Sequence, residues 1–263
     1  MNGVFTAELT RLFRPSPIVT AACAVAAPVL AVIALALLLP EHAAAGAAAD
    51  GAARMPMDLE ALTSPDGAPA AVRLLAPQLA IVAYCLFALS CGRDLTHATA
   101  RVARLQGPSA RRIHVGRLLA LGALTAAVSA IALVATLLAG GAAALSRGAS
   151  LKAWTSAPAL DALFQQWAGV TLAGCCLGAL GALAALATRS GGAATGIGLV
   201  TLLVIDPLLS VWQPLRGLTP GALINEVAWC APDRTTAMVA VAVTTALAAW
   251  AGTSVYERRS ATA

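Results

Sequence analysis

Hydrophobic residues occur along this chain in six long runs, which polar or proline-rich segments separate. Each run is close to the roughly 20 residues that a helix needs to cross the hydrocarbon core of a bilayer. The runs are rich in alanine and leucine, and they lack the alternation of apolar and polar positions that is typical of barrel strands. We therefore predict six membrane-spanning helices, at residues 17–39, 74–90, 118–138, 167–187, 193–211 and 235–255.

Two of these runs leave an alternative open. The second run has Pro77 and Gln78 near its beginning, so that a shorter or irregular helix is the alternative there. The first run follows Arg11 and Arg14 and resembles the apolar core of a signal peptide. At about 22 residues it is longer than the usual core of about 7–15, and we expect it to be a retained first helix.

The amino-acid composition indicates that most of this chain is surrounded by lipid. The chain is 59% hydrophobic and 11% charged, with a mean hydropathy of +0.82, whereas a soluble domain is about 25% charged. In lipid every backbone polar group needs a partner within the protein, so only helices or closed barrels cross the membrane. We predict an all-α polytopic membrane protein in which residues 1–263 form a single transmembrane domain.

Lysine and arginine set the orientation of the bundle, because they concentrate on the cytosolic side of membrane proteins. With the N-terminus inside, eleven of the 17 basic residues lie in cytosolic segments, and nine of the 12 acids lie outside. We therefore expect both termini to be cytosolic. The net charge of +5 is then explained by the excess of arginine in the cytosolic segments, and it does not indicate a nucleic-acid partner.

Two segments outside the runs are predicted to interact with the membrane surface. Residues 1–16 form an amphipathic segment that is either an elbow helix bracing the first span or an ordinary juxtamembrane anchor. The last outer connection, residues 206–234, combines four prolines with apolar pieces. We expect short re-entrant helices in it, with a simple surface loop as the alternative.

Small residues recur at helical spacing in the fourth and fifth runs. Gly174 and Gly178 form one pair, and Gly192 and Gly196 form another. Such spacing lets helices approach closely in lipid. It predicts either packing within the chain or a seam between two copies.

The spans carry no catalytic or metal-binding pattern. The three histidines lie in predicted loops: His42, His97 and His114. We expect the cysteines to be small packing residues. Lys152 is the only lysine and follows a leucine in an outer loop, so the sequence has no phosphate-binding loop for ATP. We predict no catalytic residue, no metal and no cofactor in this chain.

The connection between the second and third runs, residues 93–117, carries six arginines. It begins with an acidic residue, continues through a threonine and a leucine to a proline, and ends in basic residues before the next span. In order, these residues are Asp94, Thr99, Arg101, Arg104, Leu105, Pro108, Arg111, Arg112 and Arg117. This connection, together with the predicted topology, resembles the first cytosolic loop of ABC-2 type transporter permeases. Asp94, Ala98 and Arg117 replace the glutamate, glycine and lysine that are usual in that family.

The resemblance implies a membrane subunit that pairs with a second permease copy or a sister permease. It also implies separate ABC ATPase subunits that bind ATP and magnesium. A cytosolic coupling helix from about Asp94 to Leu105 would contact the ATPase, with Thr99, Arg101, Arg104, Pro108, Arg111 and Arg112 in the same loop. The alternative is that these arginines only enforce orientation and contact anionic lipid.

We therefore expect a permease of the bacterial cytoplasmic membrane that exports an amphipathic or hydrophobic substrate, because the spans are almost uncharged. A non-transporting anchor, immunity or sensing subunit is the second hypothesis. A lipid-modifying enzyme is the third, and it lacks a visible cluster of acid, base and nucleophile.

Overall fold

The computed structural model describes most of the hydrophobic runs and several of the turns between them. The described residues are 6, 7, 10, 20–27, 30, 31, 75–96, 109–146, 148, 151–210 and 234–261. Within them every regular element is helical and there is no strand, which confirms the all-α prediction. Four helices are long and apolar enough to cross a membrane. The chain therefore has the helices of a multi-pass membrane protein.

These four helices correspond to the second, third, fourth and sixth hydrophobic runs. They are α6 (Leu75–Thr96), α8 (Ala110–Ser146), α9 (Ala157–Thr188) and α13 (Arg234–Ala261). The fifth run forms α10 (Gly191–Val200), a π-helix η2 (Thr201–Ile205) and α11 (Asp206–Ser210). Its apolar part, Gly191–Ile205, is shorter than the four spanning helices. The first run is helical at the residues that are described, 20–27, 30 and 31.

Several helices begin or end outside the predicted spans. The helix of the fourth run begins at Ala157 and not at 167. The carbonyl of Ser156, which has extended backbone, accepts the first helical hydrogen bond from Leu160 N at 3.0 Å, and a proline follows in the first turn. The α8 helix has 37 residues and, at a rise of about 1.5 Å per residue, is about 55 Å long. Pro77 falls in the first turn of α6, where proline is tolerated, so this helix is regular.

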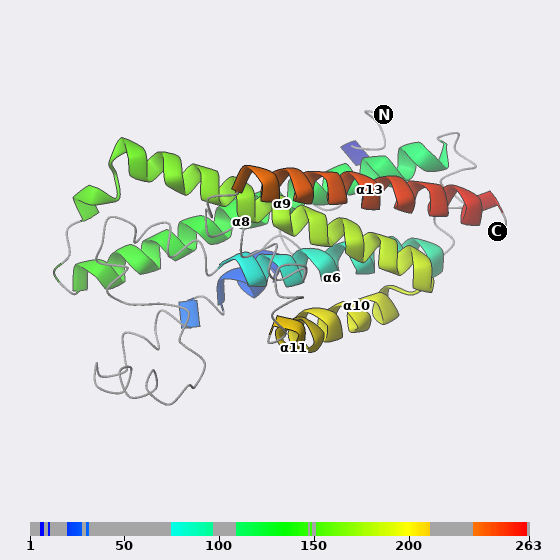
Figure 1. Ribbon diagram of the computed structural model, residues 1–263, viewed down its shortest axis with the longest axis horizontal. Coiled ribbons are helices and arrows are strands. Elements are labelled where there is room, and N and C mark those ends of the chain that lie inside the picture. The colour runs from blue at the N-terminus through cyan, green and yellow to red at the C-terminus, as the bar shows by residue number, and fades with distance from the viewer. Residues whose placement is uncertain are drawn as a thin grey trace.

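Consecutive helices run in opposite directions (Figure 1). In this view α6, α9 and α13 run from left to right, while α8 and α10 run back. The end of α6, the beginning of α8, the turn between α9 and α10 and the end of α13 therefore lie together at the right. The short helix η1 (Leu151–Ala153), between α8 and α9, lies at the opposite end.

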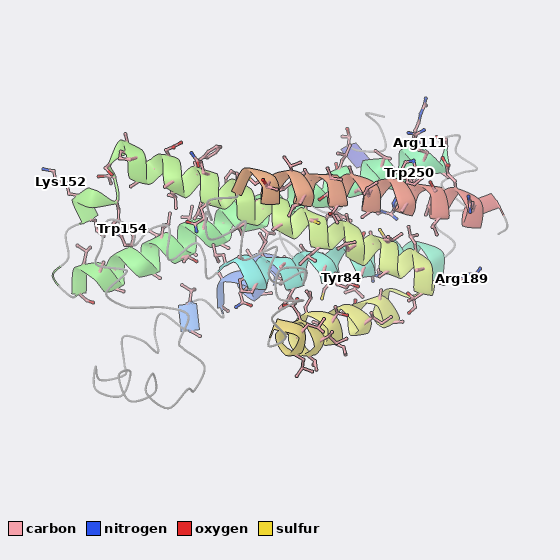
Figure 2. The ribbon with its side chains drawn as sticks, in the orientation of Figure 1. Tyr84, Arg111, Lys152, Trp154, Arg189 and Trp250 are labelled. Atoms are coloured by element: carbon pink, nitrogen blue, oxygen red, sulfur yellow. The ribbon has the colours of Figure 1, made fainter. Side chains whose placement is uncertain are left out.

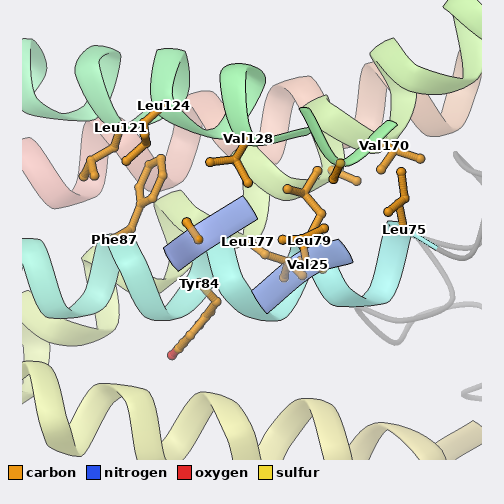
Figure 3. Packing of buried hydrophobic residues seen from close by; sticks show 14 of the residues in the cluster. Val25, Leu75, Leu79, Tyr84, Phe87, Leu121, Leu124, Val128, Val170 and Leu177 are labelled. Carbon is orange, nitrogen blue, oxygen red and sulfur yellow. The ribbon is translucent and has the colours of Figure 1, made fainter. Parts of the chain in front are cut away.

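The main hydrophobic core surrounds α6. Leu79 and Phe87 of this helix are buried against Leu124 of α8 and Leu177 of α9, and Val25 from residues 20–27 joins them. Figure 3 shows these side chains between the ribbons of α6 and α8. The α13 helix packs against α9 and α8 on the other side of the bundle.

Glycine allows the closest helix approaches in this core. A Cβ atom on Gly178 would lie 2.8 Å from Cδ2 of Phe87, and Gly92 of α6 meets Gly191 of α10 backbone to backbone. The face that contains Gly178 therefore packs against α6 of the same chain. Gly192 and Gly196, by contrast, are exposed.

Two predicted segments lie mostly outside the described residues. Of the predicted elbow helix, only Thr6, Ala7 and Thr10 are described, and all three are helical. Thr10 Oγ1 donates a hydrogen bond to the Thr6 carbonyl at 2.9 Å. Of the last outer connection, only the α11 residues and Arg234 are described, so the predicted re-entrant helices stay a prediction.

Candidate functional site at one end of the bundle

Arginines gather where the end of α6, the beginning of α8, the α9–α10 turn and the end of α13 meet. We call this region the arginine end and define it by five exposed side chains: Arg93, Arg111, Arg112, Arg189 and Arg258. Figure 2 shows Arg111 and Arg189 at this end and Lys152 at the other. Glu257 of α13 is the one exposed acidic side chain described here. The arginine end is therefore a strongly positive surface.

The beginning of α8 holds two of these arginines in a defined position. Ser109 caps the helix, since its Oγ accepts a hydrogen bond from the backbone N–H of Arg112 at 3.4 Å, and its carbonyl accepts one from Ile113 at 3.1 Å. Arg111 and Arg112 thus lie in the first turn, where the positive end of the helix dipole disfavours cations by about 0.3–1 kcal/mol each. An anionic partner would offset this repulsion.

The α9–α10 turn presents a third arginine. Arg189 ends α9 in the left-handed conformation, with φ of 58°, and Ser190 Oγ accepts a hydrogen bond from Ala193 N at 3.2 Å to begin α10. This turn is short, and Gly191 directly after it packs against α6. The Arg189 guanidinium is therefore carried on a rigid connection beside the end of α6.

The structure describes three of the eight predicted coupling residues. Arg111 and Arg112 lie together in α8, and the backbone of Asp94 lies in the last turn of α6. The α6 helix continues through Thr96, so Asp94 does not begin a separate helix. Burial of Cys91 and Gly92 against the neighbouring helices explains this extension beyond residue 90. Thr99, Arg101, Arg104, Leu105 and Pro108 lie outside the described residues.

Sequence reasoning placed His114 in a loop, and the structure corrects this. His114 is in the second turn of α8, and it is buried, as is Arg117 one turn later. Both residues are in phase with the apolar face of this helix, which also includes Ile113 and Leu121. That periodicity could have predicted the helix in the sequence. The beginning of the helix was missed because arginines surround these apolar positions.

A stacked pair of rings connects this part of α8 to the C-terminal helix. The His114 and Tyr256 ring centroids are 5.2 Å apart, and the ring planes differ by 20°. Tyr256 is buried beside Ala110 and Leu186. The arginine end therefore has a buried base in which α8, α9 and α13 meet.

A second polar contact lies farther along α8, and it contains no charge. Ser129 Oγ accepts a hydrogen bond from Trp167 Nε1 at 3.0 Å and is 2.9 Å from Thr171 Oγ1. The polar atom of the Trp167 ring therefore points at α8. This contact fixes α9 against α8 by hydrogen bonds between neutral groups.

Within the described ranges, no three His, Cys, Asp or Glu residues are grouped to hold a metal ion. The five described cysteines, Cys23, Cys85, Cys91, Cys175 and Cys176, are free thiols. The exposed guanidinium groups of the arginine end are the charged donors that this end offers, and such groups pair with carboxylates and phosphates. No family model matches the chain, and none of the curated proteins matches it.

Proposed function

We propose that this chain is the membrane-spanning permease subunit of an ATP-driven exporter of the ABC-2 type. In this proposal it lies in a bacterial cytoplasmic membrane with the arginine end in the cytosol. A separate ATPase subunit binds and hydrolyses ATP, and a second permease copy or a sister permease completes the membrane part. The substrate is amphipathic or hydrophobic.

The observation that carries the proposal is the arginine end. The connection of residues 93–117, whose sequence resembles the coupling loop of such permeases, leaves α6 and enters α8 there. The exposed Arg111 and Arg112 are joined at this end by Arg189 from a different turn. An ATPase subunit with an acidic surface would contact both connections at once.

The orientation of the bundle supports the same proposal. Charged side chains at the opposite end include Lys152 and Asp161. Among the side chains that the structure describes, the exposed arginines lie at the arginine end. By the positive-inside rule this end faces the cytosol, where ATP is found. The neutral contact between Ser129, Trp167 and Thr171 is compatible with a pathway for an amphipathic cargo.

The proposal is tested by co-expressing the chain with an ABC ATPase encoded beside it and purifying the complex through a tag on this chain. We expect ATPase activity to co-elute, and Arg111→Glu with Arg112→Glu to reduce the bound ATPase at least tenfold, because a charge-assisted contact becomes repulsive. Lys152→Glu is the matched control, since it reverses a charge at the opposite end.

The outcome separates this proposal from its alternative. Wild-type chain that recovers no ATPase would support a non-transporting anchor or sensing subunit. If the ATPase co-elutes but the charge reversals at Arg111 and Arg112 leave it bound, the arginine end is not the docking surface. Export of an amphipathic dye by the reconstituted complex then tests the transport function directly.

A further inference from the structure

The buried base of the arginine end contains a contact between the two helices that begin and end there. His114 is in the second turn of α8, in the part of residues 93–117 that is helical. Tyr256 is near the end of α13. Both side chains are 2% exposed. The contact therefore joins residues 93–117 to the C-terminal helix within the protein interior.

Two residues of α13 lie against the His114 ring. One face stacks on Tyr256, and Nε2 is 3.1 Å from the position that a Cβ atom would take on Gly252. Leu186 of α9 is 3.6 Å from that same position. We call His114, Leu186, Gly252 and Tyr256 the His114 junction. A Cβ atom at 252 would displace the imidazole by a few tenths of an ångström, so glycine favours this close approach to the backbone of α13.

The stability of the folded protein does not by itself explain why position 114 is a histidine. Nε2 is buried and has no hydrogen-bond partner among the residues that the structure describes, and a buried polar atom without a partner costs free energy. A phenyl ring would keep the stacking and avoid this cost. The presence of a histidine at this position is therefore explained if its Nε2 gains a hydrogen-bond partner in a second arrangement of α8 and α13.

Polar groups that could serve as this partner are near on both helices. Thr253 is buried in the same turn of α13 as Gly252, and its hydroxyl now donates to the Ala249 carbonyl at 2.7 Å. Arg117 is buried one turn along α8. A small rotation or sliding of one helix against the other would change which of these groups lies beside Nε2. Packed helices switch between discrete arrangements of this kind.

We propose that the His114 junction is a two-position contact that transmits movement of residues 93–117 to α13, with His114 as its positioning residue. This inference rests on the proposed function for its purpose, since an ATPase that pulls on the connection would supply the movement. The mechanical link itself is a property of this chain alone.

The link is tested first in the purified full-length chain, in a variant whose native cysteines are replaced by alanine. A cysteine introduced as Ser109→Cys reports on the connection through its rate of maleimide labelling. We expect Tyr256→Ala to change that rate by about fivefold or more, the lower end of the range for coupled sites. Trp250→Ala is the control on the same helix, because Trp250 is 70% exposed. An unchanged rate in Tyr256→Ala would overturn the link.

The two-position role is tested in the reconstituted complex with the ATPase. His114→Phe keeps the stacked ring and removes the unpartnered buried nitrogen, so we expect normal ATPase binding and an unfolding temperature no lower than that of the wild type, but a several-fold lower export per ATP hydrolysed. Wild-type export per ATP in His114→Phe would overturn the role of the nitrogen. If no ATPase binds the wild-type chain, the proposed function is wrong, and export per ATP cannot be measured. The labelling experiment then still decides whether the junction transmits movement.

Discussion

At the scale of single residues, Tyr84 determines how three helices fit together. Its hydroxyl donates a hydrogen bond to the Ala194 carbonyl of α10 at 3.2 Å, and its backbone lies against Gly181 of α9. Its ring fills the space that a side chain at Gly198 would occupy. A single aromatic residue of α6 thus sets the position of both neighbours, because glycines leave room for it.

Gly198→Ala should therefore destabilise the bundle. The new Cβ atom would overlap the Tyr84 ring, and overpacking of this kind costs about 1–3 kcal/mol. Gly196→Ala is the matched control, since no atom lies within 4 Å of its added Cβ. Thermal unfolding in detergent measures both variants. Equal unfolding temperatures for the two would show that Tyr84 does not pack as described.

Residue types alone indicated part of this packing. The spacing of Gly174 and Gly178 predicted a close helix contact, and the structure places α6 against Gly178. The spacing could not distinguish this face from the equally spaced Gly192 and Gly196, which are exposed. The distinction depends on where Phe87 and Tyr84 of a different helix lie, and no local pattern contains that information.

At the scale of elements, α8 and α9 are joined by hydrogen bonds as well as by apolar packing. Ser129 is the shared centre, in contact with both Trp167 and Thr171 of α9. In a membrane, such interhelical hydrogen bonds contribute about 0.6 kcal/mol on average and up to about 1.7 kcal/mol. The contact is therefore a modest but specific contribution to the register of these two helices.

Ser129→Ala should lower the free energy of unfolding by about 1 kcal/mol, because it removes the acceptor of the Trp167 N–H inside the bundle. Ser254→Ala is a suitable control, since among the described residues the Ser254 hydroxyl bonds to the Trp250 carbonyl of its own helix and to no other helix. Denaturant titration in mixed micelles, followed by tryptophan fluorescence, measures the difference. A Ser129→Ala variant as stable as Ser254→Ala would contradict this account.

The hydropathy of the sequence predicted most of the helices, but it predicted their first and last residues less well. The beginning of α9 follows from the Ser156 cap, but the helix then passes through Asp161, Gln165 and Gln166 before the apolar run. A count of apolar residues excludes these polar positions from a span, while the helix itself continues through them. The same reasoning placed His114 outside a helix and so missed the buried base of the candidate site.

At the scale of the whole molecule, the alternation of helix directions separates the two ends chemically. Arg189 and Lys152 lie at opposite ends of the bundle (Figure 2), and the exposed arginines belong to the end with Arg189. The sequence predicted this separation from the distribution of charge, although it could not show how the helices are packed at the end that Arg189 and Arg111 share. At that end α10 packs against α6, which brings the turn with Arg189 beside the end of α6.

Single cysteines test the orientation. In a variant without native cysteines, Arg189→Cys should be labelled by a membrane-impermeant maleimide only after the cells are opened. Lys152→Cys should be labelled in intact cells, because the positive end faces the cytosol. Labelling of both positions from the same side would contradict the alternating arrangement, and exchange of the two results would invert the orientation.

The length of α8 makes bilayer thickness a variable to which the protein responds. The apolar part of α8, from Leu118 to Leu145, is about 42 Å long at a rise of about 1.5 Å per residue. It exceeds a hydrocarbon core of about 30 Å, so it tilts or thickens the bilayer around it at a cost that grows with each ångström of mismatch. Thicker membranes relieve that cost and favour a more upright α8. The acyl-chain length of the surrounding lipid thus acts on the same helix whose first turns carry Arg111 and His114.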